Sequence, residues 1–166
     1  MLQLTPMSKV VSPLLVRALR PEDRDRYRRA VDGLSAGTVR LRFGGRRPRL
    51  TDAEVESFLD VGRGGREAVV ATDPDGEIVG VARFAPARDD PAAVEAAVVV
   101  ADRWQGRGVG TALVDRLVPL AWRDGFRQVR ATSLVENQAV AAVLRSHGFR
   151  PVVASYGVVE WMLSRS

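Results

Sequence analysis

The stretch Val98-Val99-Val100-Ala101-Asp102-Arg103-Trp104-Gln105-Gly106-Arg107-Gly108-Val109-Gly110-Thr111-Ala112-Leu113 decides the fold of this 166-residue chain. It begins as an apolar run with the character of a buried strand, passes through a glycine-rich turn, and opens directly into a helical pattern. Glycine lets a backbone approach a ligand closely and adopt dihedral angles that other residues avoid. The N-terminus of a helix presents unpaired N–H groups and the positive end of a dipole. The turn therefore predicts an anion site, and pyrophosphate is the obvious ligand.

Two better-known phosphate loops do not fit this turn. No lysine follows the glycines, which excludes the loop Gly-x-x-x-x-Gly-Lys-Ser/Thr. The Rossmann signature Gly-x-Gly-x-x-Gly has a different spacing and follows the first strand of its fold, whereas this turn lies about two thirds of the way along the chain.

Length and composition limit the classes of protein to which the chain can belong. With 166 residues, 46% of them hydrophobic and 27% charged, it suits one globular domain over residues 1–166, of which about 1–12 form a loose lead. The absence of cysteine excludes disulfides, thiolate metal sites and a cysteine nucleophile. Because His147 is the only histidine, we expect neither a metal nor a catalytic triad.

The charge and the apolar runs bear on location and partners. No run approaches the roughly 20 apolar residues that span a bilayer, and the first residues lack the pattern of a secretory signal, so we expect a cytoplasmic protein with no membrane partner. A net charge of +5, nearly all from arginine, favours anionic partners. Nucleic acid is not favoured, because the basic stretches lack interleaved aromatic residues and a recognition helix.

Hydrophobic periodicity and turn signals predict a mixed α/β fold, with one sheet and helices on both faces. We expect strands at 14–19, 68–72, 78–84, 94–100 and 129–134, and two more between 149 and 163. We expect helices at 21–34, from 51 onward, at 108–123 and at 137–147, and an arginine-rich loop at 40–49. Thr51 and Glu54 have the spacing of a capping box. Pro119 should kink or shorten its helix.

Two motifs in this order resemble those of the GCN5-related N-acetyltransferases, the GNAT superfamily. Gln105-x-x-Gly108-x-Gly110 is similar to the family's acetyl-CoA pyrophosphate loop. Glu136-Asn137-Gln138-Ala139-Val140 and Leu144-Arg145-Ser146-His147-Gly148-Phe149 resemble its second signature. The resemblance covers about residues 14–163 and implies the GNAT fold: a mostly antiparallel sheet of six to seven strands, splayed at the cofactor strand and flanked by about four helices.

The resemblance also implies how acetyl-CoA, the co-substrate, is bound. Backbone amides of the turn would hold the pyrophosphate, and the pantetheine arm would pair with the preceding strand and with Asn137. The implied cofactor-binding residues are Val98, Val99, Val100, Gln105, Gly106, Arg107, Gly108, Val109, Gly110, Thr111 and Asn137. Simpler readings stay open: a tight turn without a ligand for the glycines, and a helix N-cap for Asn137. His147 is expected to be structural, at a helix C-terminus.

Glu95 is the lone charge in the apolar run 92–100 and is the candidate general base. An amine must be neutral to attack a thioester, and a carboxylate tuned by partial burial can take its proton. Strand alternation places Glu95, Ala97 and Val99 on one face, and we expect burial to raise the pKa of Glu95. The alternative is a cross-strand ion pair with Arg83, which lies opposite Glu95 if the hairpin is centred near Asp89.

The run 95–100 also resembles the corresponding strand of bacterial Pat-type protein lysine acetyltransferases, whose glutamate is the proposed base. Arg42-Phe43, Ala68-Val69-Val70-Ala71 and Val79-Gly80-Val81-Ala82-Arg83-Phe84 resemble the same group. Pat enzymes acetylate a lysine of acyl-CoA synthetases, so the resemblance implies a protein lysine as acceptor and such a synthetase as partner. The chain departs from the wider family at Leu144, where many members carry a tyrosine that acts as general acid. It also carries neither the cyclic-nucleotide module nor the synthetase-like region that many Pat proteins have.

The sequence leaves the acceptor open. The densest positive cluster is Arg42, Arg46, Arg47 and Arg49, which suits either an acidic protein surface beside the acceptor groove or a solvated loop. An open groove there would favour a protein acceptor, and a deep acidic pocket would favour a small amine such as an amino acid, polyamine or antibiotic. The alternative from another class is a non-catalytic acyl-CoA-binding module, with Glu95 held in an ion pair.

Overall fold

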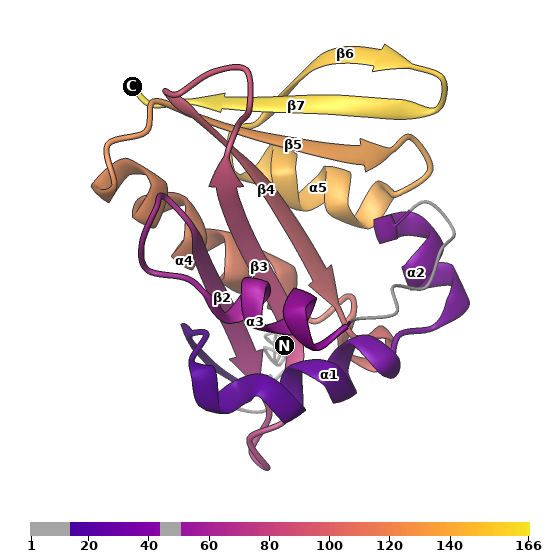
Figure 1. Cartoon of the computed structure of the whole chain (residues 1–166). Coiled ribbons are helices and arrows are strands. Elements are labelled where there is room, and N and C mark those ends of the chain that lie inside the picture. Colours follow the sequence, from indigo (N-terminus) through magenta and orange to yellow (C-terminus); the bar gives the residue numbers. More distant parts are fainter. Residues whose placement is uncertain (1–13, 44–50) are drawn as a thin grey trace, which may run out of the picture.

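A computed structural model describes residues 14–43 and 51–166 of the chain (Figure 1). Seven strands form one sheet in the order β1-β2-β3-β4-β5-β7-β6, in which every neighbouring pair is antiparallel except β4 and β5. The strands are β1 (Leu15–Ala18), β2 (Glu67–Thr72), β3 (Ile78–Pro86), β4 (Ala93–Val100), β5 (Gln128–Leu134), β6 (Arg150–Ser155) and β7 (Val158–Ser164). The helices are α1 (Arg24–Asp32), α2 (Ala36–Phe43), α3 (Asp52–Leu59), α4 (Val109–Arg123) and α5 (Gln138–Ser146), with short 3₁₀ turns at Pro21–Asp23 and Asp102–Trp104.

The strand and helix order expected from the sequence is confirmed, with two differences. The expected loop at 40–49 begins as a helix, since α2 runs from Ala36 to Phe43. The arginines at 46, 47 and 49 lie outside the described residues, as does the expected N-terminal lead at about 1–12. Helix α4 continues through Pro119 as far as Arg123, so the proline does not shorten it.

The sheet splits open at β4, its middle strand. Strand β4 pairs with β3 along its whole length, from Val94 opposite Pro86 to Val100 opposite Gly80. Its pairing with β5 covers only Ala93 to Ala96, whereas β5 pairs with β7 on its other edge from Gln128 to Leu134. In Figure 1 the strands β5, β7 and β6 cross the top of the view, while β4 diverges from them toward the lower right. Within the described sheet, residues 97–100 therefore have a free edge, as the predicted splay requires.

The sheet separates two hydrophobic cores. Helices α4 and α5 pack on one face, where Leu113, Leu117 and Leu144 join Phe84, Trp161 and other strand residues. Helices α1 and α3 cover the other face, where Tyr27 and Val55 pack on Val70 and Val81. Helices on both faces of one sheet confirm the predicted mixed α/β fold.

Glycine 80 brings α4 close to β3. A Cβ atom at this position would stand 2.9 Å from Leu113 Cδ1 and 3.1 Å from Val109 Cγ1. Real Cβ atoms essentially never make contacts below 3.0 Å, and a contact of 3.1 Å is tighter than nine in ten of those they make. The missing side chain therefore fixes the start of α4, and with it the glycine-rich turn, against the sheet.

A buried ion pair fixes the start of α1. Asp23, whose side chain is 1% exposed, accepts bonds of 2.7 Å from both guanidinium nitrogens of Arg17, and one of 2.9 Å from the backbone N–H of Arg20. The hydrogen bond from Arg17 lowers the pKa of the Asp23 carboxyl; burial opposes that shift and the Arg20 N–H adds to it. Strand β1 is thereby joined to the helix that covers the second core.

Candidate active site

The glycine-rich turn leaves the N-terminus of α4 open. Gly106 and Gly108 have φ angles of 70° and 81°, in the left-handed region that favours glycine. No described side chain caps α4 at Gly108, and nothing stands within 4 Å of where a Cβ would be at Gly106 or Gly108. The first amides of a helix have no partner inside it. Those of Val109, Gly110 and Thr111 therefore have no partner within α4, and the anion site stays a prediction.

Gln105 has a structural role in this turn. Its Nε2 donates to the carbonyl oxygen of Val100 at 3.0 Å and to Thr38 Oγ1 at 3.1 Å. The hydroxyl of Thr38 in turn donates to Asp102, and this bond lowers the pKa of Asp102. The side chain of Gln105 therefore ties the end of β4 to α2 and holds the turn in shape.

Three other predicted cofactor-binding residues, Arg107, Val109 and Asn137, have contacts within the protein. The Arg107 guanidinium sits 5.2 Å from the ring centre of Trp104, which is buried beneath the turn. Val109 is buried in the core, so only its backbone can face a ligand. Asn137 Oδ1 accepts a 3.2 Å bond from the N–H of Val140 and caps α5, which confirms the predicted helix N-cap.

Helix α2 connects the glycine-rich turn to the residues just before α5. Besides the bond from Gln105 to Thr38, it carries Arg40, which forms an ion pair with Glu136 next to Asn137. The hydrogen bond from Arg40 lowers the pKa of Glu136. No local motif reveals this bridge, because its partners are about 70 to 100 residues apart in the sequence.

Two expectations for Glu95 are wrong. Its side chain is exposed, so the expected burial is not found. The hairpin pairs Glu95 with Ala85 and Arg83 with Ala97, because it is centred one residue later than expected; the cross-strand pair with Arg83 therefore does not form. In the parallel pair of β4 and β5, Glu95 faces Arg130, but the Arg130 guanidinium binds Asp89 and Asp90 instead. Among the described residues no ion pair holds Glu95.

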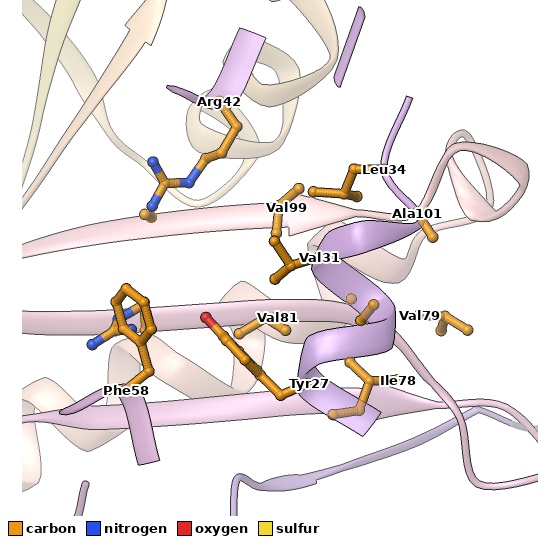
Figure 2. Close-up of a pocket in the computed structure, with 14 residues that line it drawn as sticks. Tyr27, Val31, Leu34, Arg42, Phe58, Ile78, Val79, Val81, Val99 and Ala101 are labelled. Carbon is orange, nitrogen blue, oxygen red and sulfur yellow. The ribbon is translucent and has the colours of Figure 1, made fainter. Parts of the chain in front are cut away.

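The shared face of Glu95, Ala97 and Val99 is supported, because Ala97 and Val99 both line a cavity on the α1–α3 side of the sheet. The cavity measures about 80 Å³ and lies between α1, α2, α3 and strands β3 and β4. Figure 2 shows Tyr27, Val31 and Leu34 entering from α1 and the chain after it, Phe58 from α3, and Arg42 from α2. Sequence reasoning missed this cavity because its walls come from five separate elements.

Two arginines give the cavity its charge. The Arg83 guanidinium lies 4.2 Å from the ring centre of Phe58. Burial lowers the pKa of Arg83, and the nearby hydroxyl of Tyr27 raises it again in part. Burial likewise lowers the pKa of Arg42, with a smaller opposing effect from Tyr27 and a further lowering by the charge of Arg83. Both stay cationic at neutral pH, since a guanidinium does not lose its proton in proteins.

Comparison with known proteins identifies the family. The model of the acetyltransferase (GNAT) family matches residues 38–149, which include the turn, β4 and α5. The chain belongs to the GNAT family of acetyltransferases. It is 34% identical over 139 residues to the acetyltransferase PA5475 of Pseudomonas aeruginosa, covering 82% of this chain and 74% of that protein.

Solved structures agree with this GNAT assignment. The GNAT domain of PAT from S. lividans superposes with a TM-score of 0.81 at 26% identity, covering 90% of this chain and 89% of that one. The acetyltransferase yncA of Salmonella typhimurium, solved with its cofactor acetyl-CoA, shares the fold with a TM-score of 0.71 at 22% identity, covering 91% and 93%.

The remaining motif positions of this GNAT protein are structural. Leu144, at the position where the resemblance places a tyrosine acid, is buried in the α4–α5 core. His147 Nε2 lies 2.7 Å from Asp115 and its Nδ1 lies 2.7 Å from the carbonyl oxygen of Val143, so both ring nitrogens have partners at the end of α5, as expected of a structural histidine. Within residues 14–43 and 51–166, no cluster of three or more His, Cys, Asp or Glu could hold a metal, and no helix is long and apolar enough to cross a membrane.

Proposed function

We propose that this GNAT protein transfers an acetyl group from acetyl-CoA to a primary amine, by direct attack within a ternary complex. The observation that carries the proposal is the junction at the end of β4. There, a strand edge with no partner among the described residues runs into a glycine-formed helix N-terminus that no described side chain caps, and a cavity opens on the adjoining face. The edge offers backbone hydrogen bonds, the helix N-terminus favours phosphate, and the cavity receives an acceptor.

The donor side uses backbone groups almost throughout. The amides from Gly106 to Thr111 would hold the pyrophosphate, and the free edge at Val98 to Val100 would pair with the amide groups of pantetheine. Asn137 has Oδ1 engaged in its cap, so its Nδ2 is the group that would reach the pantetheine. Backbone donors on β4 would also stabilise the negative charge that develops on the thioester oxygen.

The acceptor amine must lose a proton before it attacks. For a lysine amine of pKa about 10.4, this costs about 4–5 kcal/mol at pH 7. Glu95 is the proposed base, because it lies on the cavity face of β4, two residues before Ala97 and the free edge. Since Glu95 is exposed, we expect it to take the proton through a water molecule.

Departure of the thiolate needs no tyrosine at position 144. Thiols have pKa values near 8.5, close to neutral pH, so coenzyme A leaves as an anion without full protonation by the protein. The buried Leu144 is therefore compatible with acetyl transfer.

The proposed acceptor is a protein lysine, such as one on an acyl-CoA synthetase. The resemblance of residues 95–100 to Pat-type enzymes supports this proposal, and so does the likeness to the GNAT domain of PAT from S. lividans. A small-molecule amine is the second candidate, and the partly enclosed cavity favours it. The cavity carries arginines and no acidic residue among its described lining, which argues against polyamines and cationic antibiotics. The single domain over 1–166 and the cytoplasmic location stay predictions.

Transfer of radiolabelled acetyl groups from acetyl-CoA into host lysate tests the function. We expect label on a discrete protein, with the rate falling about 100-fold in Glu95→Gln and unchanged in Glu22→Gln, which removes an exposed charge beside α1. Label confined to small molecules would replace the protein lysine by a small amine. If acetyl-CoA bound but no label were transferred to any amine, the chain would be a binding module and the proposal would be wrong.

A further inference from the structure

The cavity on the α1–α3 side has a charged end and an apolar end. Apart from Arg42 and Arg83, its described lining is aliphatic or aromatic. In Figure 2 Arg42 and Phe58 lie at one end of the cavity, and the Arg83 guanidinium belongs to the same end because it lies 4.2 Å from the centre of the Phe58 ring. Ile78 and Ala101 lie at the other end, away from these charges.

The charged end is the one beside the proposed reaction centre. Arg83 is directly opposite Ala97, and Glu95 lies two residues before Ala97 on the same face of β4, about 6.5 Å away along the strand. In the other direction the same face leads to Val99, which is opposite Val81 and packs in the core that α1 covers. A molecule whose amine meets Glu95 therefore extends its remaining atoms over an apolar floor.

The volume and the polarity of the cavity limit what can fill it. The cavity measures about 80 Å³, and a water molecule needs roughly 10–15 Å³ of this kind of volume, so about five to eight groups of that size fit. Each methylene group moved from water into an apolar site improves binding about fourfold. A buried hydroxyl without a hydrogen-bond partner weakens binding about tenfold or more. The apolar end therefore selects carbon over oxygen and nitrogen.

We propose that the acceptor is a small primary amine with an apolar tail of about five carbons, which lies between α1 and the β3–β4 pair. This inference rests on the proposed function and concerns its second candidate acceptor, the small-molecule amine. The amine nitrogen bonds to the thioester carbon, the carbon–sulfur bond breaks, coenzyme A leaves as the thiolate, and the proton of the amine passes through water to Glu95. A lysine in a protein chain has only four methylene groups before its polar backbone, which suits the apolar end less well.

Chain length and polarity of the amine test the proposal. Thiol release from acetyl-CoA is measured with unbranched amines from ethylamine to octylamine. We expect kcat/KM to rise about fourfold per methylene group up to about pentylamine and to level off or fall beyond it. 4-Aminobutan-1-ol, which has a hydroxyl in place of the terminal methyl group of pentylamine, is the matched control and should be about tenfold poorer or worse.

Three results of this series would overturn the proposal. The first is a flat profile from ethylamine to octylamine, and the second is an equal kcat/KM for pentylamine and 4-aminobutan-1-ol. The third is a larger kcat/KM for Nα-acetyl-lysine N-methylamide than for pentylamine, which would assign the cavity to a protein lysine.

Variants of one wall residue connect the profile to this cavity. Val31 lines the cavity from α1, whereas Val114 is similarly buried on α4 in the core on the other face of the sheet. Val31→Ala enlarges the cavity and should move the best amine to a longer chain, and Val31→Phe should move it to a shorter one. Val114→Ala removes the same atoms from the other core and should leave the best chain length unchanged. Because amines are compared within each variant, a loss of folded protein cancels. A best chain length that stays the same in both Val31 variants would contradict the proposal.

Binding without catalysis separates this inference from the proposed function. Pentylamine is titrated into the protein with coenzyme A present, which carries no acetyl group, and the methyl signals of Val31, Val81 and Val99 are followed by NMR. We expect saturable shifts with pentylamine, and with 4-aminobutan-1-ol only at about tenfold higher concentration or more. Absence of shifts with pentylamine, while other amines are acetylated, would overturn the inference and leave the proposed function standing. Shifts with pentylamine but no thiol release with any amine would instead contradict the proposed function.

Discussion

The two sides of β4 differ in how they are built. On the proposed donor side, the strand edge and the turn are continuous in sequence, from Val98 to Thr111, and they offer mainly backbone groups. On the proposed acceptor side, Tyr27, Arg42, Phe58 and Arg83 come from four elements and meet only in the folded chain. The donor side is therefore a local motif, whereas the acceptor side is a product of packing.

This difference suits the division of labour in a transferase with a fixed donor and a variable acceptor. Backbone amides bind pyrophosphate whatever side chains surround them, provided that glycines allow the turn. Side chains on separate helices can change without disturbing the sheet, so the acceptor side can be altered while the donor side is kept. Variants on one side should leave binding on the other side nearly intact.

The largest effect is expected from a charge placed in the turn. Gly108→Asp puts a carboxylate at the N-terminus of α4, where pyrophosphate would lie, and like charges in contact cost several kcal/mol. We expect the Kd for acetyl-CoA to rise about 100-fold or more. Gly108→Asn has the same shape and a similar tolerance of positive φ, and should raise the Kd less than tenfold. Calorimetric titration of both variants checks this, and equal losses would show that shape, not charge, matters at the turn.

A second effect is expected on stability rather than binding. Asp23→Asn leaves the partly buried Arg17 without its charged partner, and breaking such a pair costs about 3 kcal/mol. Urea unfolding at pH 7 measures this cost. Because α1 forms a wall of the acceptor cavity, the variant should lower the affinity for the acceptor. Its affinity for acetyl-CoA at low temperature should stay unchanged. An equal loss of affinity for acetyl-CoA and for the acceptor would contradict the independence of the two sides of β4.

The Asp23 pair also has a defined pH dependence. The pKa of Asp23 is lowered in the folded state, so its contribution is complete above the ordinary aspartate value near 3.9 and is lost as the pH falls through the folded-state value. The stability difference between wild type and Asp23→Asn should therefore stay constant from pH 7 to about 5 and shrink below about pH 4. A difference that is unchanged at pH 3 would contradict the account of Asp23.

The smallest effect is expected from one hydroxyl in the cavity. Tyr27→Phe removes the group that interacts with Arg83 and Arg42 but keeps the ring. We expect the KM for the acceptor to change about three- to tenfold, as for one hydrogen bond to a charged group, with the Kd for acetyl-CoA unchanged. Steady-state kinetics with each substrate varied separately measure both values. A change in the Kd for acetyl-CoA alone, with the KM for the acceptor unchanged, would contradict the placement of Tyr27 on the acceptor side.

What the sequence could predict follows the same division. The strand order, the turn at Gly106 to Gly110 and the Asn137 cap depend on neighbours in the chain, and these were predictable. The exposure of Glu95 was not, because an apolar strand sequence does not show that one face of β4 stays open to solvent at its start. The register was two residues off, with Arg83 opposite Ala97 and not Glu95, for a similar reason: the loop conformation at Asp89 to Pro91 decides where the hairpin turns.

Amide hydrogen exchange with and without acetyl-CoA tests the central claim most directly, namely that the donor is bound by the free edge of β4 and the turn that follows it. We predict slower exchange on addition of acetyl-CoA across residues 97–111, with little change across the cavity walls at 27–34 and 78–83. Slower exchange at the cavity walls, with none in 97–111, would contradict the account and place the donor on the other face of the sheet.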